Sequence, residues 1–172
     1  MTNFVKQYAE FGLPFPTVGF NLNTADAWAA GVGNLTGTWP TVWYHTLDNP
    51  RSKAFVEAFQ AKYNRLPENH AWISYVTLKI MAQAMAEAGS AETPALIEYL
   101  ESGAEFDILK DRPAYFRPWD HQLIQEAYPF TVKPEGEAAD EYDMIVLGDA
   151  VPAASEPLEG IYPTAEQNAC TF

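Results

Sequence analysis

Cysteine and basic residues are the scarcest features of this sequence, and their scarcity narrows what the chain can be. Cys170 is the single cysteine among 172 residues, which excludes an internal disulfide and any metal site built from several cysteines. Its thiol is either inert and loosely exposed, or half of a disulfide whose partner lies outside this chain. Ten Lys and Arg residues face 23 Asp and Glu residues, giving a net charge of −13. Nucleic acid is therefore excluded as a partner, because neutralising phosphates requires clustered cations.

Motifs for catalysis, cofactors and metals are also missing. The segment Gly31-Val-Gly33 lacks the rest of a dinucleotide-binding or phosphate-binding loop. None of the three histidines is paired with another at the spacing of helical metal ligands: His45, His70 and His121. Asp120 and His121 are adjacent and point to opposite sides of an extended segment, which favours a structural turn over an acid–base pair. We therefore expect no catalytic residue, no cofactor and no metal site.

No export or membrane signal is visible. Residues 1–12 contain one lysine, no apolar run and no small-residue cleavage site, so they do not resemble a signal peptide. The longest predicted helix, 68–88, contains Lys79, Gln83 and Glu87, which makes it too polar to span a membrane. Taken alone, and provided that Met1 is a true start, these features predict a cytosolic chain.

Local patterns predict an alternation of helices and strands. Apolar spacing and capping residues predict helices at 3–11, 24–30, 50–63, 68–88 and 93–103. The N-caps are Asn23 or Thr24 for the second helix, Asn49 before Pro50 for the third, and Thr93 before Pro94 for the fifth. Strands are predicted at 17–20 (buried), 38–44, 105–109, 114–117, 127–132 and 142–147, the last two as a hairpin. Prolines beyond residue 149 predict an extended, irregular tail.

The order of the predicted elements indicates an α/β fold. Too few strands follow in βαβ succession for a full doubly wound sheet, so the chain resembles part of a larger fold.

A family resemblance emerges between Asn49 and Ser90. The order Phe55-x3-Phe59-x3-Tyr63, Pro67, Trp72-Ile-Ser-Tyr75 and Ala84-Met-Ala-Glu-Ala-Gly-Ser90 is similar to the type I periplasmic binding proteins of branched-chain amino acid ABC transporters. Upstream, Phe4-Val5 and Val18-Gly19 resemble a helix and a strand of the family's second lobe. Downstream, Arg117-Pro-Trp-Asp-His-Gln122 resembles an Arg-x-x-Asp-His-Gln segment of one branch. The resemblance extends over nearly the whole chain.

The resemblance implies an incomplete α/β fold of the type I periplasmic-binding-protein kind, with parts of two Rossmann-like lobes. Residues 1–44 then form part of lobe II, 45–49 a hinge crossing, 50–117 part of lobe I, 118–122 a second crossing, and 123–172 the return to lobe II with the acidic tail. The hinge residues implied are His45, Asp48, Trp119 and Asp120. The missing partner segments would leave strand edges and apolar helix faces uncovered, which predicts self-association.

The implied function is that of a non-enzymatic substrate-binding component of an ABC importer, present as a truncated form. Ligand-binding residues implied by position are Asn21 and His70. Trp72, in the first turn of the predicted long helix, is a further candidate, although simple core packing is the favoured interpretation of this residue. Asn21 is neutral where amino-acid-binding members carry an acid, so the ligand is an amino acid, an amide or an aromatic or organic carboxylate. The partners implied are that small molecule and a membrane permease, and the compartment of the parent protein is the periplasm, where Cys170 fits an orphaned disulfide partner. The alternative function is a ligand-sensing domain of a receptor or regulator with the same fold.

Overall fold

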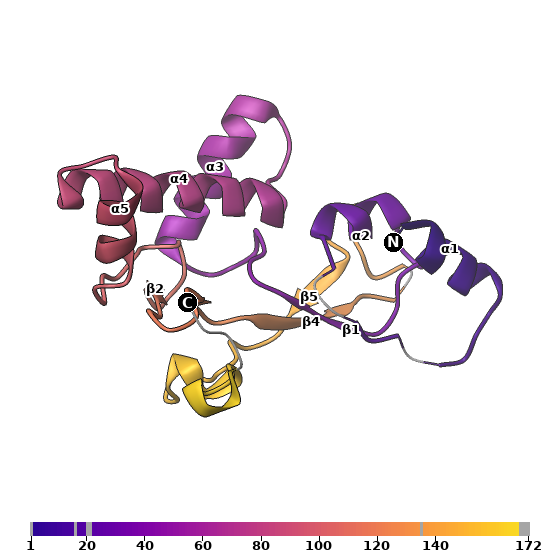
Figure 1. The fold of residues 1–172 in the computed structure, drawn as a ribbon. Helices are drawn as coiled ribbons and strands as arrows, with labels where there is room; N and C mark the ends of the chain where they lie inside the picture. The colour runs from indigo at the N-terminus through magenta and orange to yellow at the C-terminus, as the bar shows by residue number, and fades with distance from the viewer. Residues whose placement is uncertain (1, 16, 20–21, 135, 169–172) are drawn as a thin grey trace. The chain divides into compact units, whose positions relative to one another are not determined.

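The computed structural model describes residues 2–15, 17–19, 22–134 and 136–168, and the chain divides into two compact units (Figure 1). The first unit contains Met1–Trp72 and Ala127–Val151, and the second contains Ile73–Glu126 and Pro152–Phe172. The lobe and hinge boundaries expected from the resemblance stay a prediction. No helix in the described part of the chain combines the length and apolar character that a membrane crossing requires.

Three helices of the first unit begin and end at local sequence signals. They are α1 (Thr2–Glu10), α2 (Thr24–Ala30) and α3 (Pro50–Tyr63). The Asn23 side chain accepts a hydrogen bond from the Ala25 N–H at 3.0 Å and so caps α2. Asn49 caps α3 by accepting from the N–H groups of Arg51 and Ser52. These bonds satisfy donors that the first turn of a helix leaves unpaired, which confirms the cap predicted at Asn49.

The sheet of the first unit has three antiparallel strands in the order β1-β4-β5. They are β1 (Thr38–Thr41), β4 (Tyr128–Val132) and β5 (Ile145–Leu147). β4 and β5 pair with Phe130 opposite Leu147, which confirms the predicted hairpin. β1 is shorter than predicted and stands at the edge, where Pro40 faces Pro129. An edge strand tolerates proline because one row of its backbone groups needs no ladder partner.

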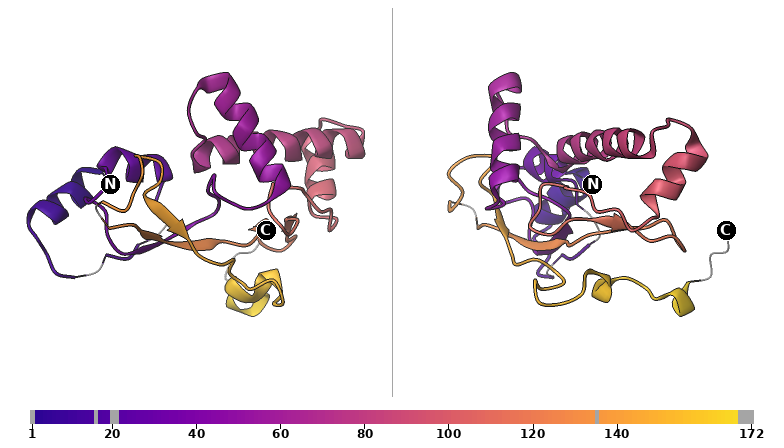
Figure 2. Two further views of the ribbon diagram at one scale, coloured as in Figure 1. Left: turned by 180° about the vertical axis from the view of Figure 1, so that it is seen from behind. Right: turned by 90° about the vertical axis from the view of Figure 1, so that its left-hand side faces the viewer.

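The core of the first unit lies between this sheet and two helices. Val5 of α1 and Ala27 of α2 are buried against Trp39, Phe130 and neighbouring apolar side chains. Figure 1 and the left view of Figure 2 show α1 and α2 on one face of the strands. A helix pair on one sheet face buries apolar area from both elements, which is the main stabilising term of such a layer.

The prediction of a buried strand at 17–20 is wrong for the residues that the structure describes. In its described part, Thr17–Gly19, only a single parallel bridge joins Val18 to Thr38, and the Val18 side chain is 76% exposed rather than buried. Phe20 lies outside the described residues. The approach to the sheet is close: Gly37 has φ +91°, and a Cβ there would lie 1.7 Å from the Thr17 carbonyl oxygen. Only glycine fits that position.

The second unit contains most of a long helix and a small hairpin. α4 (Asn69–Ala88) starts in the first unit and continues into the second, where α5 (Thr93–Leu100) follows it. The N-cap of α5 is Glu92 rather than the predicted Thr93, and it makes no side-chain cap bond. β2 (Tyr115–Phe116) pairs with β3 (Leu123–Ile124), and the predicted strand at 105–109 is reduced to one bridge between Phe106 and Ala114.

The C-terminal segment of the second unit is anchored by two arginines. Arg112 donates to the carbonyl oxygens of Pro152, Ala153 and Glu156, and its Nε lies 2.7 Å from the buried carboxylate of Glu126. Arg117 donates to the Pro163 carbonyl at 3.0 Å. The segment also forms two short 3-10 helices, η1 (Leu158–Ile161) and η2 (Ala165–Gln167), where the prolines predicted irregular chain. Pro157 and Pro163 precede these helices rather than lying inside them, so no backbone donor of either helix is lost to a proline.

Candidate functional site

The starts of α2 and α4 meet through a buried polar pair, Thr24 and Asn69. The Thr24 hydroxyl and backbone N–H donate to Asn69 Oδ1 at 3.3 and 3.4 Å, and the Asn69 N–H donates to the Thr24 hydroxyl at 3.1 Å. Both side chains are buried. Buried polar groups are costly unless they are hydrogen-bonded, so this reciprocal pair fixes how the two helix ends meet. We call Thr24, Glu68, Asn69 and His70 the helix-junction site.

The Glu68 carboxylate accepts hydrogen bonds from backbone N–H groups in the first turn of α4. Its two carboxylate oxygens accept from the backbone N–H groups of His70 at 2.6 Å and Ala71 at 2.7 Å. A helix N-terminus attracts anions because its first N–H groups lack partners, and here an internal carboxylate already fills that position. An anionic ligand at this helix end therefore has to displace Glu68 or bind through a side chain.

His70 is the most exposed side chain of the helix-junction site. Its imidazole is 58% exposed, and its Nδ1 lies 3.4 Å from Glu68. Neutral imidazole offers one donor and one acceptor, so His70 can hydrogen-bond a carboxylate or an amide of a ligand. Its part in ligand binding stays a prediction.

Trp72 points into the core. It is 1% exposed, its ring stacks on Trp43 with planes 3° apart and centroids 6.1 Å apart, and Trp43 Nε1 donates to Ser52 at 2.9 Å. This geometry is that of the packing alternative, and a ligand contact by Trp72 stays a prediction. Asn21, the third predicted ligand residue, lies outside the described residues. The sequence did not single out the pairing of Thr24 with Asn69, because no local pattern links positions 45 residues apart. Glu68 was also missed, although its bonds to the N–H groups of His70 and Ala71 are local and an acidic residue at a helix start is the signal that could have identified it.

His45, a predicted hinge residue, is held in an aromatic cluster of the first unit. Its ring lies 5.9 Å from that of Trp28 and 4.2 Å from that of Tyr44, and Tyr44 donates to the Tyr142 carbonyl at 2.7 Å. The buried Nδ1 of His45 has no hydrogen-bond partner among the described residues. Burial lowers the pKa of His45 to about 4, even though the nearby carboxylates of Asp140 and Asp143 favour the charged form.

The other predicted hinge residues, Asp48, Trp119 and Asp120, contact charged side chains close to them in the sequence. Asp48 is exposed and meets Lys53 at 2.5 Å. Asp120 accepts from Arg117 Nε and from the Gln122 N–H, both at 3.1 Å, and the Arg117 guanidinium also lies 4.0 Å from the Trp119 ring. Residues 118–122 therefore form the structural turn that was predicted for Asp120 and His121. Their hinge role stays a prediction.

The described residues hold no group of three or more His, Cys, Asp or Glu side chains that could bind a metal ion. The helix-junction site offers hydrogen-bonding side chains rather than a nucleophile with an adjacent base. Donors and acceptors of this kind suit non-covalent recognition of a small polar molecule, and a binding role for the site stays a prediction.

The sequence profile of the periplasmic binding protein family matches residues 1–138, and the chain belongs to this family. Its members are non-enzymatic solute-binding proteins, in agreement with the predicted absence of catalysis. A comparison with curated proteins found no significant match.

Solved structures share the fold over most of the chain. A periplasmic binding protein from Burkholderia mallei aligns with a TM-score of 0.82 at 20% identity, covering 98% of this chain and 44% of its own. A branched chain amino acid ABC transporter periplasmic ligand-binding protein from Burkholderia xenovorans LB400 aligns with a TM-score of 0.71 at 25% identity, covering 87% and 40%. An ABC transporter solute binding protein from Rhodopseudomonas palustris BisB5, in complex with 3,4-dihydroxy benzoic acid, gives 0.71 at 20% identity, covering 87% and 41%.

These alignments confirm the predicted α/β fold of the type I periplasmic-binding-protein kind. The chain spans less than half the length of each of the three proteins.

Proposed function

We propose that the chain belongs to the substrate-binding component of an ABC importer and recognises a small solute. The observation that carries the proposal is the family match over residues 1–138, together with alignments of this fold to transporter proteins. The partner in this proposal is a membrane permease, and the compartment is the periplasm. Relatives are described with amino acids or with an aromatic acid, so the solute class is an amino acid, an amide or an organic carboxylate.

His70 is the side chain we assign to ligand recognition at the helix-junction site. It is exposed, it lies beside the polar Thr24–Asn69 pair, and its imidazole hydrogen-bonds both carboxylates and amides. Glu68 opposes a carboxylate at the same helix end, so an amide or a zwitterion is favoured over a simple anion.

The test is isothermal titration calorimetry of the chain with L-leucine, benzamide and benzoate. We expect weak, saturable binding of at least one of them, and a loss of affinity of about tenfold in His70→Ala, the size expected for one lost hydrogen bond. Glu57→Ala is the matched control, because Glu57 is exposed on α3 and lies outside both the helix-junction site and the predicted hinge residues. Absence of binding by all three solutes, or equal affinity of the His70 variant and the control, contradicts the assignment.

A further inference from the structure

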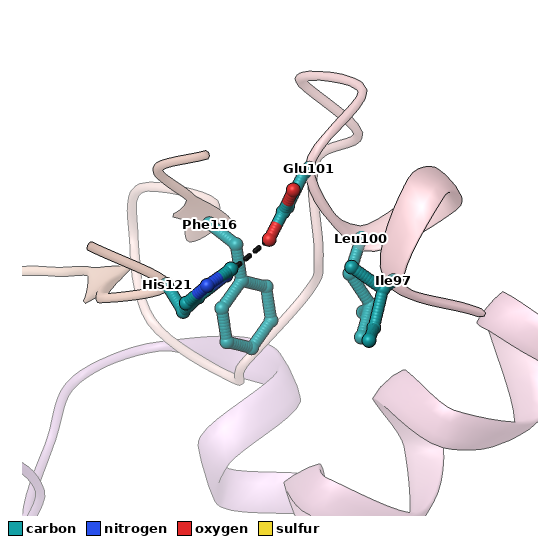
Figure 3. A pocket seen from close by; sticks show the side chains of 5 residues that line it. All are labelled: Ile97, Leu100, Glu101, Phe116 and His121. Atoms are coloured by element: carbon teal, nitrogen blue, oxygen red, sulfur yellow. Dashed lines mark hydrogen bonds and ion pairs between the residues drawn. The ribbon is translucent and has the colours of Figure 1, made fainter. Parts of the chain in front are cut away.

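A cavity of about 230 Å³ opens in the second unit, and no residue that lines it belongs to the helix-junction site (Figure 3). Its lining side chains come from α5, from the residue after it, from β2 and from the turn before β3: Ile97, Leu100, Glu101, Phe116 and His121. Figure 3 shows the Phe116 ring facing Ile97 and Leu100 across the opening, with Glu101 and His121 meeting at its rim.

The apolar walls are held from behind by aromatic packing. Phe116 packs edge-on against the fully buried Phe106 at 5.9 Å, and Phe106 packs against Tyr99 of α5 at 6.3 Å. Ile97 and Leu100 stand three positions apart, so they share one face of α5. The walls are therefore set by the fold before any ligand arrives, as is typical of small-molecule sites.

The polar rim of the cavity consists of Glu101 and His121, and backbone geometry and hydrogen bonds hold both in place. His121 adopts a left-handed backbone with φ 55° at the tip of the turn, and its Nδ1 contacts Oε1 of Glu101. The Arg117 N–H donates to the Gln122 carbonyl at 3.0 Å and closes the turn beneath it. A carboxylate has two oxygens, so Glu101 can pair with His121 and still accept a hydrogen bond from a molecule in the cavity.

We propose that this cavity binds a small neutral aromatic molecule carrying one N–H or O–H donor. The ring lies between Phe116 and the α5 side chains, and the donor bonds the Glu101 carboxylate. An apolar cavity of about 150 Å³ accommodates benzene, so 230 Å³ accommodates a bicyclic ring of the size of indole. The Glu101 carboxylate and the net charge of −13 oppose an anionic ligand. The proposal does not depend on the proposed transport function.

The test is an NMR titration of the ¹⁵N-labelled chain with indole, 1-methylindole and benzoate. We expect saturable amide shifts around Leu100, Phe116 and His121 with indole, about tenfold weaker binding of 1-methylindole, which lacks the donor, and no binding of benzoate. Absence of saturable shifts with indole overturns the site. Equal affinity for indole and 1-methylindole, or equal binding of benzoate, overturns the assigned chemistry.

Two variants separate binding in the cavity from binding elsewhere. Leu100→Trp fills the cavity and should abolish the shifts, while Leu78→Trp adds the same ring at an exposed position of α4 and should leave them unchanged. Glu101→Ala should lower the affinity for indole to that for 1-methylindole without changing the latter. Glu101 is partly exposed and lies at the rim rather than in the apolar walls, so this variant tests the proposal even if Leu100→Trp does not fold. Equal binding by Leu100→Trp and Leu78→Trp, or full affinity for indole in Glu101→Ala, refutes the proposal.

Discussion

The partly buried imidazole of His45 makes the stability of the first unit dependent on pH. Its ring lies against Trp28 and Tyr44, and its buried Nδ1 has no hydrogen-bond partner among the described residues. Protonation in place puts a charge into this aromatic cluster, whereas the unfolded chain takes up the proton in water. The perturbation that tests this is His45→Phe, which keeps a flat ring of similar size and removes the titration.

The magnitude follows from the two pKa values of His45, about 4 when folded and 6.5 when unfolded. Because the folded pKa is the lower one, the unfolded state binds more protons as the pH falls below 6.5. The stabilisation is fully present above pH 6.5, is lost as the pH falls toward 4, and does not change further below that. At 1.36 kcal/mol per pKa unit, the loss between pH 7.5 and pH 5 is about 2 kcal/mol.

The assay is urea denaturation followed by circular dichroism at pH 7.5 and pH 5, for the original chain and for His45→Phe. Carboxylates titrate in both proteins, so the difference between their two pH dependences isolates His45. We expect the original chain to lose about 2 kcal/mol more than the variant. Equal losses refute the reasoning, as does an NMR titration in which the His45 ring has an ordinary midpoint near pH 6.5. His45→Gln serves the same purpose if phenylalanine is not tolerated.

Three further outcomes are expected. Asn49→Ala removes the cap of α3 and should lower the free energy of unfolding by about 1 kcal/mol in chemical denaturation, where no change contradicts the capping role. Trp72→Ala leaves a cavity beside Trp43 and should cost about 3–5 kcal/mol; a loss under about 1 kcal/mol shows that the ring is not core. Phe11→Ser with Phe15→Ser removes rings that are 78% and 69% exposed, and should reduce the predicted self-association when the two chains are compared by light scattering; an unchanged mass distribution shows that this surface is not the contact.

Helices and strands whose formation depends on residues close together in the sequence were predictable from the sequence. Asn49 and Pro50 identify the start of α3 because a cap and a first-turn proline act within one turn. The hairpin of β4 and β5 likewise joins strands close in sequence. Val18 was predicted to be buried because it lies in an apolar run, but burial depends on what packs against the run, and within the described residues only one bridge reaches it.

The candidate site was less predictable because it depends on distant pairing. His70 and Trp72 were singled out together, yet His70 is exposed and Trp72 is fully buried. Positions two apart in a helix point about 200° apart around its axis, so the two side chains face opposite sides of α4. The pairing of Thr24 with Asn69 required two helix starts to meet across 45 positions of sequence. Threonine and asparagine are common residues, so their contact could be identified only from the folded structure.

The two arginines that anchor the C-terminal segment bind its main chain more than its side chains. Arg112 reaches three carbonyl oxygens between residues 152 and 156, and Arg117 reaches a fourth at Pro163. Every residue carries a backbone carbonyl oxygen. These hydrogen bonds therefore do not depend on which side chains the C-terminal segment has. The acidic segment can therefore diverge during evolution while keeping its path, whereas Arg112 and Arg117 cannot be exchanged without releasing it.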